Sequence, residues 1–195
     1  MEKVRWGIVS TGRITHQFIR DFNFVPNGEV VAVASRSQES ADAFARQYGI
    51  PRAYEGYERL LEDGEVDAVY VATPHTMHFQ NTVDAITAGK HVLCEVAAAM
   101  TMDECWELVD AAEETGKIYM LAEKACYFRD GMIVLNMVRK GVFGELTFAE
   151  CGYVHEIRHI HYEPDGSLTW RGRMARDWAG NNYPTHSLGP VAQWL

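Results

Sequence analysis

The sequence predicts an α/β fold built on a doubly wound parallel sheet, followed by the start of an α+β second domain with an open, mainly antiparallel sheet. Over residues 1–124, short runs rich in Val and Ala alternate with stretches that have the spacing of amphipathic helices. These runs are continuously apolar, which is typical of parallel strands covered on both faces. After residue 124 the alternation stops. We therefore expect one domain at residues 1–124 and the beginning of a second, incomplete domain at residues 125–195.

Five apolar runs of the first domain are expected to be strands, with helices between them. The expected strands are Val4–Ser10, Glu29–Ser35, Ala68–Ala72, His91–Glu95 and Ile118–Glu123. The expected helices are Ile14–Phe22, the stretch from Ser37 to Tyr48, Tyr57–Leu61, His78–Ala88 and the stretch from Thr101 to Gly116. Ser37 is a favourable N-cap, and Gly49 ends its helix. Thr101 and Glu104 form a capping box, and Gly116 ends the helix that it starts.

The second domain has a different pattern. Arg129–Lys140 is expected to form a helix, and the partial alternation of Glu145–Val154 predicts a strand in a more open sheet. His155–Asn182 is rich in His, Arg, Trp, Gly and Asp, which is typical of a long functional surface loop. His186–Leu195 begins another apolar helix. Because this helix stops with the chain, we expect the chain to be part of a longer protein.

The turn after the first strand has the pattern of a Rossmann-type dinucleotide-binding site. In such sites a strand, a tight turn and a helix bring backbone N–H groups to a pyrophosphate. Of the G-x-G-x-x-G pattern only the middle glycine is present, as Gly12, with Ser10 and Thr15 at the flanking positions. Alone, this pattern also fits an ordinary strand-to-helix turn. The cofactor residues expected here are Ser10, Thr11, Gly12, Arg13 and Ile14.

Two further strand ends point to the same cofactor. The second strand ends at Ser35 and Arg36, without the acidic residue that binds a ribose 2′-hydroxyl. These residues suit a 2′-phosphate, so the expected cofactor is NAD or NADP, although Arg36 also fits an ordinary solvated arginine. The loop after the fourth strand adds the candidates Thr73, Pro74, His75 and His78. For each histidine, a structural role is an equal alternative.

Longer stretches of the first domain resemble the Gfo/Idh/MocA family of oxidoreductases. The similar segments are Gly7–Ile14, Tyr48–Pro51, Val66–Pro74 and Ala88–Glu95. The opening segment, Arg5–Ser10, is especially similar to the dihydrodiol dehydrogenase branch. In ordinary members the strand that ends at Glu95 continues Glu-Lys-Pro, and the lysine helps to activate the substrate hydroxyl. Here the sequence continues with Val96 and Ala97, so that ammonium group is missing.

From Glu95 onward the sequence is more similar to glycoside hydrolase family 109, the NAD-dependent α-N-acetylgalactosaminidases of the same fold. The most specific shared motif is Tyr183-Pro184-Thr185-His186, which Leu188-Gly189-Pro190 follows. The resemblance implies that Glu95, Val96 and Lys124 lie at the cofactor, although the family usually has an asparagine in place of Lys124. It also implies an acidic active-site residue at Glu123. At the sugar it implies Tyr153, Arg171, Tyr183, Pro184, Thr185 and His186.

The reaction that this resemblance implies is redox-neutral: a hydride leaves the sugar C3 for bound NAD, the aglycone is eliminated, water adds, and the hydride returns. It needs one base for the C3 hydroxyl and one for the C2 proton. His186 suits the first and Tyr153 the second, or the reverse. Tyr183, three residues before His186, is expected to face the same way, and Arg171 to orient sugar hydroxyls. A conventional NAD(P)-dependent sugar or diol dehydrogenase and a non-catalytic dinucleotide-binding protein are the alternatives.

Composition limits the partners. A formal charge of −9 without a basic stripe argues against nucleic acid, and no apolar run reaches the roughly 18 residues of a membrane span. The four cysteines form no C-x-x-C pair, and in a chain expected to be cytoplasmic this favours buried thiols over a disulfide framework. No metal is expected, because no carboxylate or cysteine completes a zinc set with His155, His159 and His161. The expected partners are a small-molecule sugar or glycoside and, for a full-length form, further copies of the chain.

Overall fold

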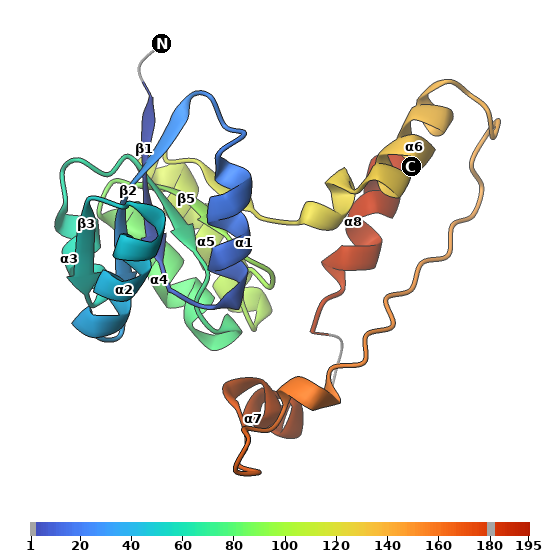
Figure 1. Cartoon of the computed structure of the whole chain (residues 1–195). Helices are drawn as coiled ribbons and strands as arrows, with labels where there is room; N and C mark the ends of the chain where they lie inside the picture. Colours follow the sequence, from blue (N-terminus) through green and yellow to red (C-terminus); the bar gives the residue numbers. More distant parts are fainter. Residues whose placement is uncertain (1–2, 179–181) are drawn as a thin grey trace. The chain divides into compact units, whose positions relative to one another are not determined.

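The computed structural model describes residues 3–178 and 182–195. The chain divides into two units, Met1–Ala122 and Glu123–Leu195. The division falls close to the domain boundary predicted after residue 124. Each unit is described by itself below, and Figure 1 shows the helices and strands of both.

The first unit is built on a six-stranded parallel sheet with the order β3-β2-β1-β4-β5-β6. Its strands are β1 (Val4–Val9), β2 (Gly28–Ser35), β3 (Arg52–Glu55), β4 (Ala68–Val71), β5 (His91–Cys94) and β6 (Tyr119–Leu121). The strand order reverses direction between β1 and β4, which is the switch point of a doubly wound sheet. The predicted fold class of this unit is therefore confirmed.

Five helices cover the two faces of this sheet (Figure 1). They are α1 (Arg13–Phe22), α2 (Gln38–Tyr48), α3 (Tyr57–Glu62), α4 (His75–Thr87) and α5 (Met102–Thr115). Ile8 and Tyr70 point to one face and lie in a core cluster with Phe44 of α2. Val9 and its alternating neighbours point to the other face and cluster with Ile86 of α4. Burial on both faces explains why the strand segments are continuously apolar.

The predicted helix caps are confirmed. Ser37 accepts a hydrogen bond from the Ser40 backbone N–H, and Gly49 adopts the left-handed conformation with φ of 69° after α2. Thr101 and Glu104 form both hydrogen bonds of the capping box at the start of α5. These local signals fix where the chain turns back toward the sheet.

Two details of the first unit differ from the prediction. The strand β3 was not predicted, because Arg52–Glu55 is short and charged at both ends; it pairs with β2 as an edge strand. The helix α4 begins at His75 rather than at His78, since Pro74 lies at its N-cap and the helix follows at once. The longer α4 draws both histidines into a helix and buries them.

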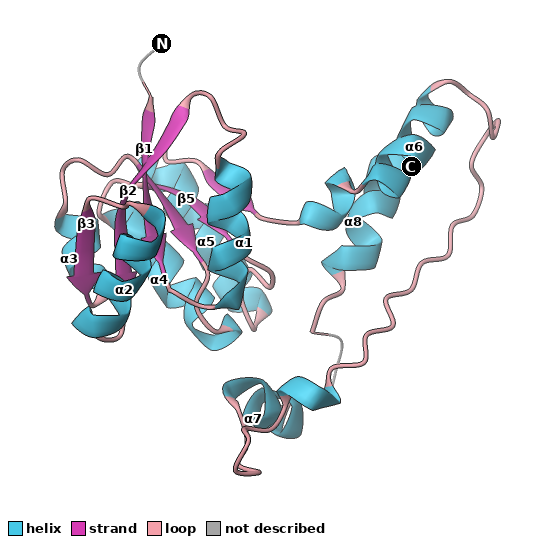
Figure 2. Cartoon of the chain, in the orientation of Figure 1, coloured by secondary structure: helices cyan, strands magenta, loops and turns pink. Residues whose placement is uncertain are grey.

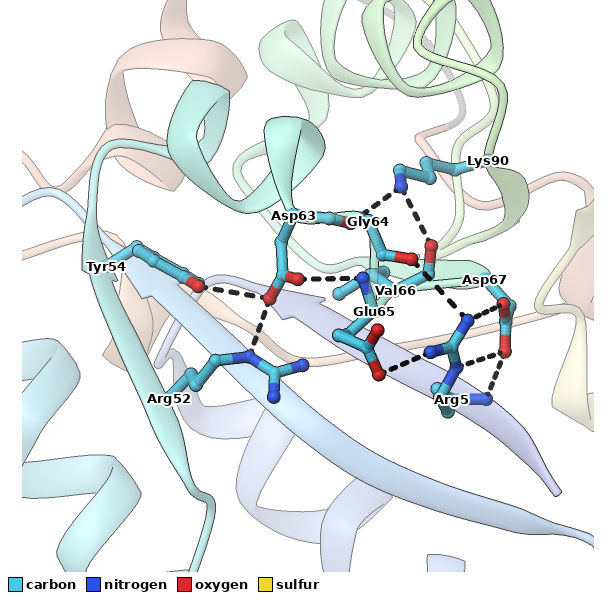
Figure 3. A network of polar contacts seen from close by, with 9 residues as sticks. All are labelled: Arg5, Arg52, Tyr54, Asp63, Gly64, Glu65, Val66, Asp67 and Lys90. Atoms are coloured by element: carbon cyan, nitrogen blue, oxygen red, sulfur yellow. Dashed lines mark hydrogen bonds and ion pairs between the residues drawn. The ribbon is translucent and has the colours of Figure 1, made fainter.

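A network of polar contacts ties β1 to the segment before β4 at the amino ends of the strands (Figure 3). The guanidinium group of Arg5 donates to both carboxylate oxygens of Asp67, at 3.0 and 2.7 Å. The buried Lys90 donates from Nζ to the backbone oxygens of Asp63 and Val66, each at 2.8 Å. This network lies at the amino ends of the strands. Ligands of such folds bind at the opposite side, at the carboxyl ends of the strands.

The second unit is helical where it has regular structure (Figure 2). Its elements are η1 (Lys124–Tyr127), α6 (Arg129–Arg139), η2 (Arg158–Ile160), α7 (Trp170–Asp177) and α8 (Thr185–Trp194). Helix α8 contacts both α6 and η1. The predicted helices at Arg129–Lys140 and His186–Leu195 are thereby confirmed within one residue at each end.

The strand predicted at Glu145–Val154 is wrong: the segment has no regular structure and is drawn as loop in Figure 2. A strand needs a neighbour for its backbone hydrogen bonds, and the described part of this unit offers only one isolated bridge, Tyr162 to Leu168. The expected open sheet is accordingly not formed by these residues. The predicted loop His155–Asn182 holds η2 and α7, and its residues 179–181 lie outside the described part.

Among the described residues, no helix combines the length and the apolar character that crossing a membrane requires.

Candidate functional site

The turn between β1 and α1 has a backbone that normally requires glycine. Ser10 has φ of 114°, and it is the one non-glycine residue with positive φ in the described part of the chain. A side chain in this region costs of order 1–3 kcal/mol. Ser10 thus keeps the conformation of the first glycine of the dinucleotide motif although its side chain is different. Strain of this kind persists where the surrounding structure enforces it, which is common at ligand sites.

The first turn of α1 presents an anion-binding end. Gly12 is exposed and lies at the N-cap, and Arg13 begins the helix with no acidic residue in the first turn. The Gly12 N–H donates to Ser10 Oγ at 3.1 Å, and a Cβ on Gly12 would meet that oxygen at 3.2 Å. The exposed N-terminus of α1 is a position that suits a pyrophosphate, as predicted, while the Gly12 N–H itself is bonded to Ser10. Ile14, by contrast, packs its side chain against the core, so a contact with cofactor would use its backbone.

The carboxyl end of β2 lies next to the β1–α1 turn. Ser35 Oγ and Thr11 Oγ1 share a hydrogen bond of 3.0 Å, which joins the β1–α1 turn to β2. Arg36 follows and is exposed. No carboxylate stands at either position, so this end of β2 presents hydroxyls and a guanidinium group. Such groups suit a 2′-phosphate, in agreement with the prediction of NADP beside NAD.

The loop after β4 is held by internal hydrogen bonds. Thr73 Oγ1 donates to Asn81 Oδ1 at 2.8 Å. His78 is 1% exposed, and its ring nitrogens lie 2.6 Å from the Ala97 carbonyl oxygen and 2.7 Å from the Thr73 carbonyl oxygen. His78 therefore connects the loops after β4 and β5. His75 is 4% exposed and lies at the start of α4, directly after Pro74.

The end of β5 carries the predicted cofactor residues Glu95 and Val96. The Glu95 carboxylate accepts a hydrogen bond of 2.6 Å from Tyr70 Oη, and Val96 is buried. The ends of β1, β2, β4 and β5 meet at one edge of the parallel sheet, on both sides of the switch point. Ligands of doubly wound folds bind in the crevice at this place. The predicted residues of the first unit are thus brought to one edge, while their individual contacts with a cofactor stay predictions.

In the second unit, the structure pairs Glu123 with His186, which are 63 positions apart. His186 Nδ1 lies 2.9 Å from both carboxylate oxygens of Glu123, and Glu123 is 9% exposed. A carboxylate only accepts hydrogen bonds, so Nδ1 carries the hydrogen. In the neutral ring, Nε2 then holds the lone pair and can accept a proton. This is the arrangement of a histidine base oriented by a carboxylate.

Three more predicted residues surround this pair. The rings of Tyr183 and His186 stack with centroids 5.2 Å apart and planes at 6°, so the expectation that they face the same way is confirmed. Tyr153 meets the His186 ring edge-on, with centroids 4.9 Å apart. Arg171 donates to the hydroxyl of Tyr183. Residues from four separate segments of the second unit therefore converge, although their catalytic roles stay predictions.

Gly189 is what allows helix α8 to come this close, and spacing alone did not single it out. A Cβ on Gly189 would meet Cys126 Sγ at 2.9 Å and Glu123 Cγ at 3.2 Å. Since Gly189 lies one turn after His186, a larger residue would push the histidine away from Glu123. Burial and the nearby charge of Glu123 raise the pKa of the Cys126 thiol. Cys126 is therefore a packing residue here.

The remaining predicted residues of the second unit have less defined surroundings. Pro184 is the N-cap residue of α8, and the buried hydroxyl of Thr185 has no hydrogen-bond partner among the residues that the structure describes. Lys124 begins η1 beside Glu123 and is partly exposed. Their predicted contacts with sugar and cofactor stay predictions.

Comparison with known families agrees with these features. The profile described as "Oxidoreductase family, NAD-binding Rossmann fold" matches residues 4–123, which is more than half of the chain. The chain belongs to the Gfo/Idh/MocA oxidoreductase family. A second profile, described as "Glycosyl hydrolase 109, C-terminal domain", matches residues 127–195. The predicted resemblances to the Gfo/Idh/MocA family and to glycoside hydrolase family 109 are confirmed, and NAD(P) is the cofactor type of the Gfo/Idh/MocA domain.

Curated relatives carry the name of the second profile. The glycosyl hydrolase family 109 protein 2 of Shewanella sp. (strain ANA-3) is 37% identical over 205 residues, which cover 100% of this chain and 45% of the relative. The glycosyl hydrolase family 109 protein of Parabacteroides distasonis is 35% identical over 222 residues, covering 99% of this chain and 48% of the relative. This Gfo/Idh/MocA chain thus spans about half the length of the curated relatives it matches.

Two solved structures are similar in fold to the first part of this chain. The 3-ketoreductase from Actinomadura kijaniata, in complex with TDP-benzene and NADP, has a TM-score of 0.68 and 32% identity, over 74% of this chain and 46% of that one. The scyllo-inositol dehydrogenase from Lactobacillus casei has a TM-score of 0.69 at 19% identity, over 75% of this chain and 44% of that one, and shows the Gfo/Idh/MocA fold.

Proposed function

We propose that the full-length protein is a redox-neutral glycosidase that uses a bound nicotinamide dinucleotide. The pairing of Glu123 with His186 carries this proposal, since it supplies an oriented base beside two tyrosines and an arginine. Val96 supports it as well, because it stands where a conventional family member has the lysine that activates its substrate hydroxyl. The similarity to glycosyl hydrolase family 109 proteins agrees.

The residues of the second unit have distinct tasks in this reaction. His186 Nε2 takes the proton of the sugar C3 hydroxyl, and Glu123 stabilises the positive charge that the ring then bears. When bound, the nicotinamide ring supplies the acceptor and later the donor of the C3 hydride. The resulting C3 ketone acidifies the C2 proton, which the phenolate form of Tyr153 removes as the aglycone leaves with the electrons of the C1–O bond. Exchanged roles for His186 and Tyr153 satisfy the same requirements.

Substrate orientation belongs to Arg171 and Tyr183. The planar guanidinium group of Arg171 is pre-organised for neighbouring oxygens, and its hydrogen bond to Tyr183 fixes both side chains.

The last steps complete the hydrolysis. Water would add at C1 of the unsaturated ketone, C2 would be protonated, and return of the hydride to C3 would give the free sugar. Atoms and electrons balance without net oxidation.

A conventional NAD(P)-dependent sugar dehydrogenase is the second candidate. The exposed Arg36 at the end of β2 favours it, together with the similarity to an NADP-binding 3-ketoreductase. In that reaction the hydride stays on the nicotinamide, so reduced cofactor accumulates as substrate is consumed.

One assay separates the candidates. The full-length gene product is incubated with p-nitrophenyl N-acetylgalactosaminides of both anomers and, separately, with free sugars plus NAD or NADP. Release of p-nitrophenol without net nicotinamide reduction supports the glycosidase, and stoichiometric reduction without release supports the dehydrogenase. Cofactor binding with neither reaction would favour a non-catalytic dinucleotide-binding protein.

The cellular setting is part of the same proposal. All four cysteines are free thiols, although only Cys94 and Cys126 are buried as expected, and Cys151 is exposed. Free thiols suit a reducing compartment, and we place the protein in the cytoplasm. Its partners would be a sugar or glycoside and further copies of the full-length chain.

A further inference from the structure

Tyr70 is an aromatic residue fixed in the centre of the sheet. It lies in β4, which runs between β1 and β5, and is 1% exposed. Its ring stacks on Phe18 of α1, with centroids 3.7 Å apart and planes at 9°. A ring held on one side by the sheet and on the other by an aromatic side chain has little rotational freedom, so the position of its hydroxyl is set by packing.

The hydroxyl of Tyr70 is directed at Glu95. Oη donates to Glu95 Oε1 at 2.6 Å, a length typical of a hydrogen bond to a charged acceptor. Burial and the charge of Glu95 raise the pKa of Tyr70 far above its ordinary value, so the phenol stays protonated and remains the donor. Within the described residues no other side-chain hydrogen bond holds the Glu95 carboxylate. Tyr70 therefore sets its orientation, and Oε2 keeps its lone pairs for another donor.

The sheet order shows which part of a dinucleotide would lie near Glu95. A dinucleotide crosses the switch point between β1 and β4, with one nucleoside on each side. Ser35 and Arg36, at the end of β2, mark the adenosine side because they suit a ribose 2′-phosphate. Glu95 ends β5, on the opposite side of the switch point, which leaves the nicotinamide nucleoside for it. A carboxylate is the group that accepts hydrogen bonds from a ribose diol.

We propose that Tyr70 is a positioning residue of the cofactor site, whose hydroxyl holds the Glu95 carboxylate ready to accept hydrogen bonds from the ribose of the nicotinamide nucleoside. The proposal rests on the NAD(P) binding that the proposed function requires, and it applies equally to the glycosidase and to the dehydrogenase. According to this proposal, Tyr70 contributes to binding of the nicotinamide nucleoside and not of the adenosine half of the dinucleotide.

The test compares ligands with and without the nicotinamide nucleoside. Dissociation constants for NADP, NAD and 2′,5′-ADP are measured by calorimetry with the full-length gene product and with Tyr70→Phe, which keeps the ring and its stacking. The expected result is an increase of about tenfold for both dinucleotides, the usual effect of losing a hydrogen bond to a charged group. The value for 2′,5′-ADP is expected to stay unchanged, because that ligand does not reach Glu95.

Tyr54→Phe is the matched control. Tyr54 also donates to a carboxylate, Asp63 Oδ2 at 3.0 Å, but in the network of Figure 3, and all three constants are expected to stay the same. In a Glu95→Ala background, Tyr70→Phe is expected to have no further effect, as a positioning role requires.

Several outcomes would overturn the proposal. Equal weakening of NADP and 2′,5′-ADP in Tyr70→Phe would show a general structural effect, and additive losses with Glu95→Ala would show independent roles. Unchanged NADP binding in Tyr70→Phe would refute the positioning role while leaving the proposed function intact. If the unaltered protein bound neither dinucleotide, the proposed function would fall together with this inference.

Discussion

At the residue scale, the proposed chemistry depends most on the contact between Glu123 and His186. Glu123 is nearly buried, so its charge acts on the imidazole with little screening by solvent. Its two oxygens both face Nδ1, which fixes the tautomer and the direction of Nε2. The stacked ring of Tyr183 limits rotation of the histidine from the side. Each of these constraints supports a base that needs no rearrangement before it accepts a proton.

Replacing Glu123 by glutamine tests this contact. Glu123→Gln keeps the size of the side chain and its hydrogen-bonding oxygen but removes the charge. We expect kcat for glycoside cleavage to fall by about 10²-fold or more, because the amide stabilises an imidazolium ion poorly. NADP affinity should stay unchanged, and so should the kcat of the control Glu163→Gln, an exposed carboxylate of the same unit. Full activity in Glu123→Gln would exclude the Glu123–His186 pair from the mechanism.

At the same scale, Arg36 is the residue predicted to distinguish NADP from NAD. Arg36→Ala is expected to weaken NADP about tenfold and to leave NAD unchanged, since only NADP carries the 2′-phosphate that the guanidinium group suits. Calorimetric titration with both cofactors measures this, with Arg46→Ala, an exposed arginine of α2, as the control. Equal effects on NAD and NADP would mean that Arg36 does not recognise the phosphate.

At the element scale, the two ends of the sheet have separate tasks. The carboxyl ends of β1, β2, β4 and β5 carry the predicted cofactor residues, while the amino ends are joined by the network around Arg5 and Lys90 (Figure 3). Hydrogen bonds from Arg5 lower the pKa of Asp67 to about 2. The contribution of Asp67 to stability at low pH therefore reports on the amino ends of the strands.

This difference gives a prediction for Asp67→Asn. The pKa of an aspartate is about 3.9 in an unfolded chain, above its value in the folded protein. The contribution of Asp67 is therefore fully present above about pH 4 and is lost as the pH falls toward 2. In urea unfolding, the original protein should be more stable than Asp67→Asn at pH 7, and this difference in stability should narrow as the pH falls from about 4 to about 2. A gap that stays constant over this range would contradict the role given to the charge.

Much of the first unit could be predicted because its strands are continuously apolar and its helices carry explicit caps, such as Ser37 and Thr101. The strand β3 could not, since Arg52–Glu55 shows neither continuous apolar character nor clear alternation. In Glu145–Val154 the alternation is real, but a strand also needs a partner, which local sequence does not reveal. The local sequence pattern therefore predicted most helices and strands, but hydrogen bonding to a neighbouring strand determined which segments formed strands.

The candidate site divides along the same line. The cofactor residues follow predicted strands, so position alone brought Ser10, Ser35 and Glu95 to one edge. The contact of Glu123 with His186 spans 63 positions, and the closeness that Gly189 permits is a matter of packing between α8 and η1. Spacing in a sequence does not encode such contacts, and only the resemblance to known proteins had named both residues.

At the scale of the whole molecule, the two units carry complementary chemistry. The first has the dinucleotide-binding features of the Gfo/Idh/MocA family, and the second holds the Glu123–His186 pair, the proposed base, with two tyrosines and an arginine. The redox-neutral route needs both in one protein, because each turnover both removes and returns a hydride. The route also leaves a chemical trace, since the C2 proton is exchanged while the C3 hydrogen is conserved.

The most direct test is therefore hydrolysis of the p-nitrophenyl glycoside by the full-length gene product in D₂O, followed by mass spectrometry and proton NMR of the sugar. The redox-neutral route predicts one deuterium at C2, the original hydrogen at C3 and no accumulation of reduced nicotinamide. Release of the sugar without deuterium at C2, or reduced nicotinamide formed in step with the substrate consumed, would contradict it.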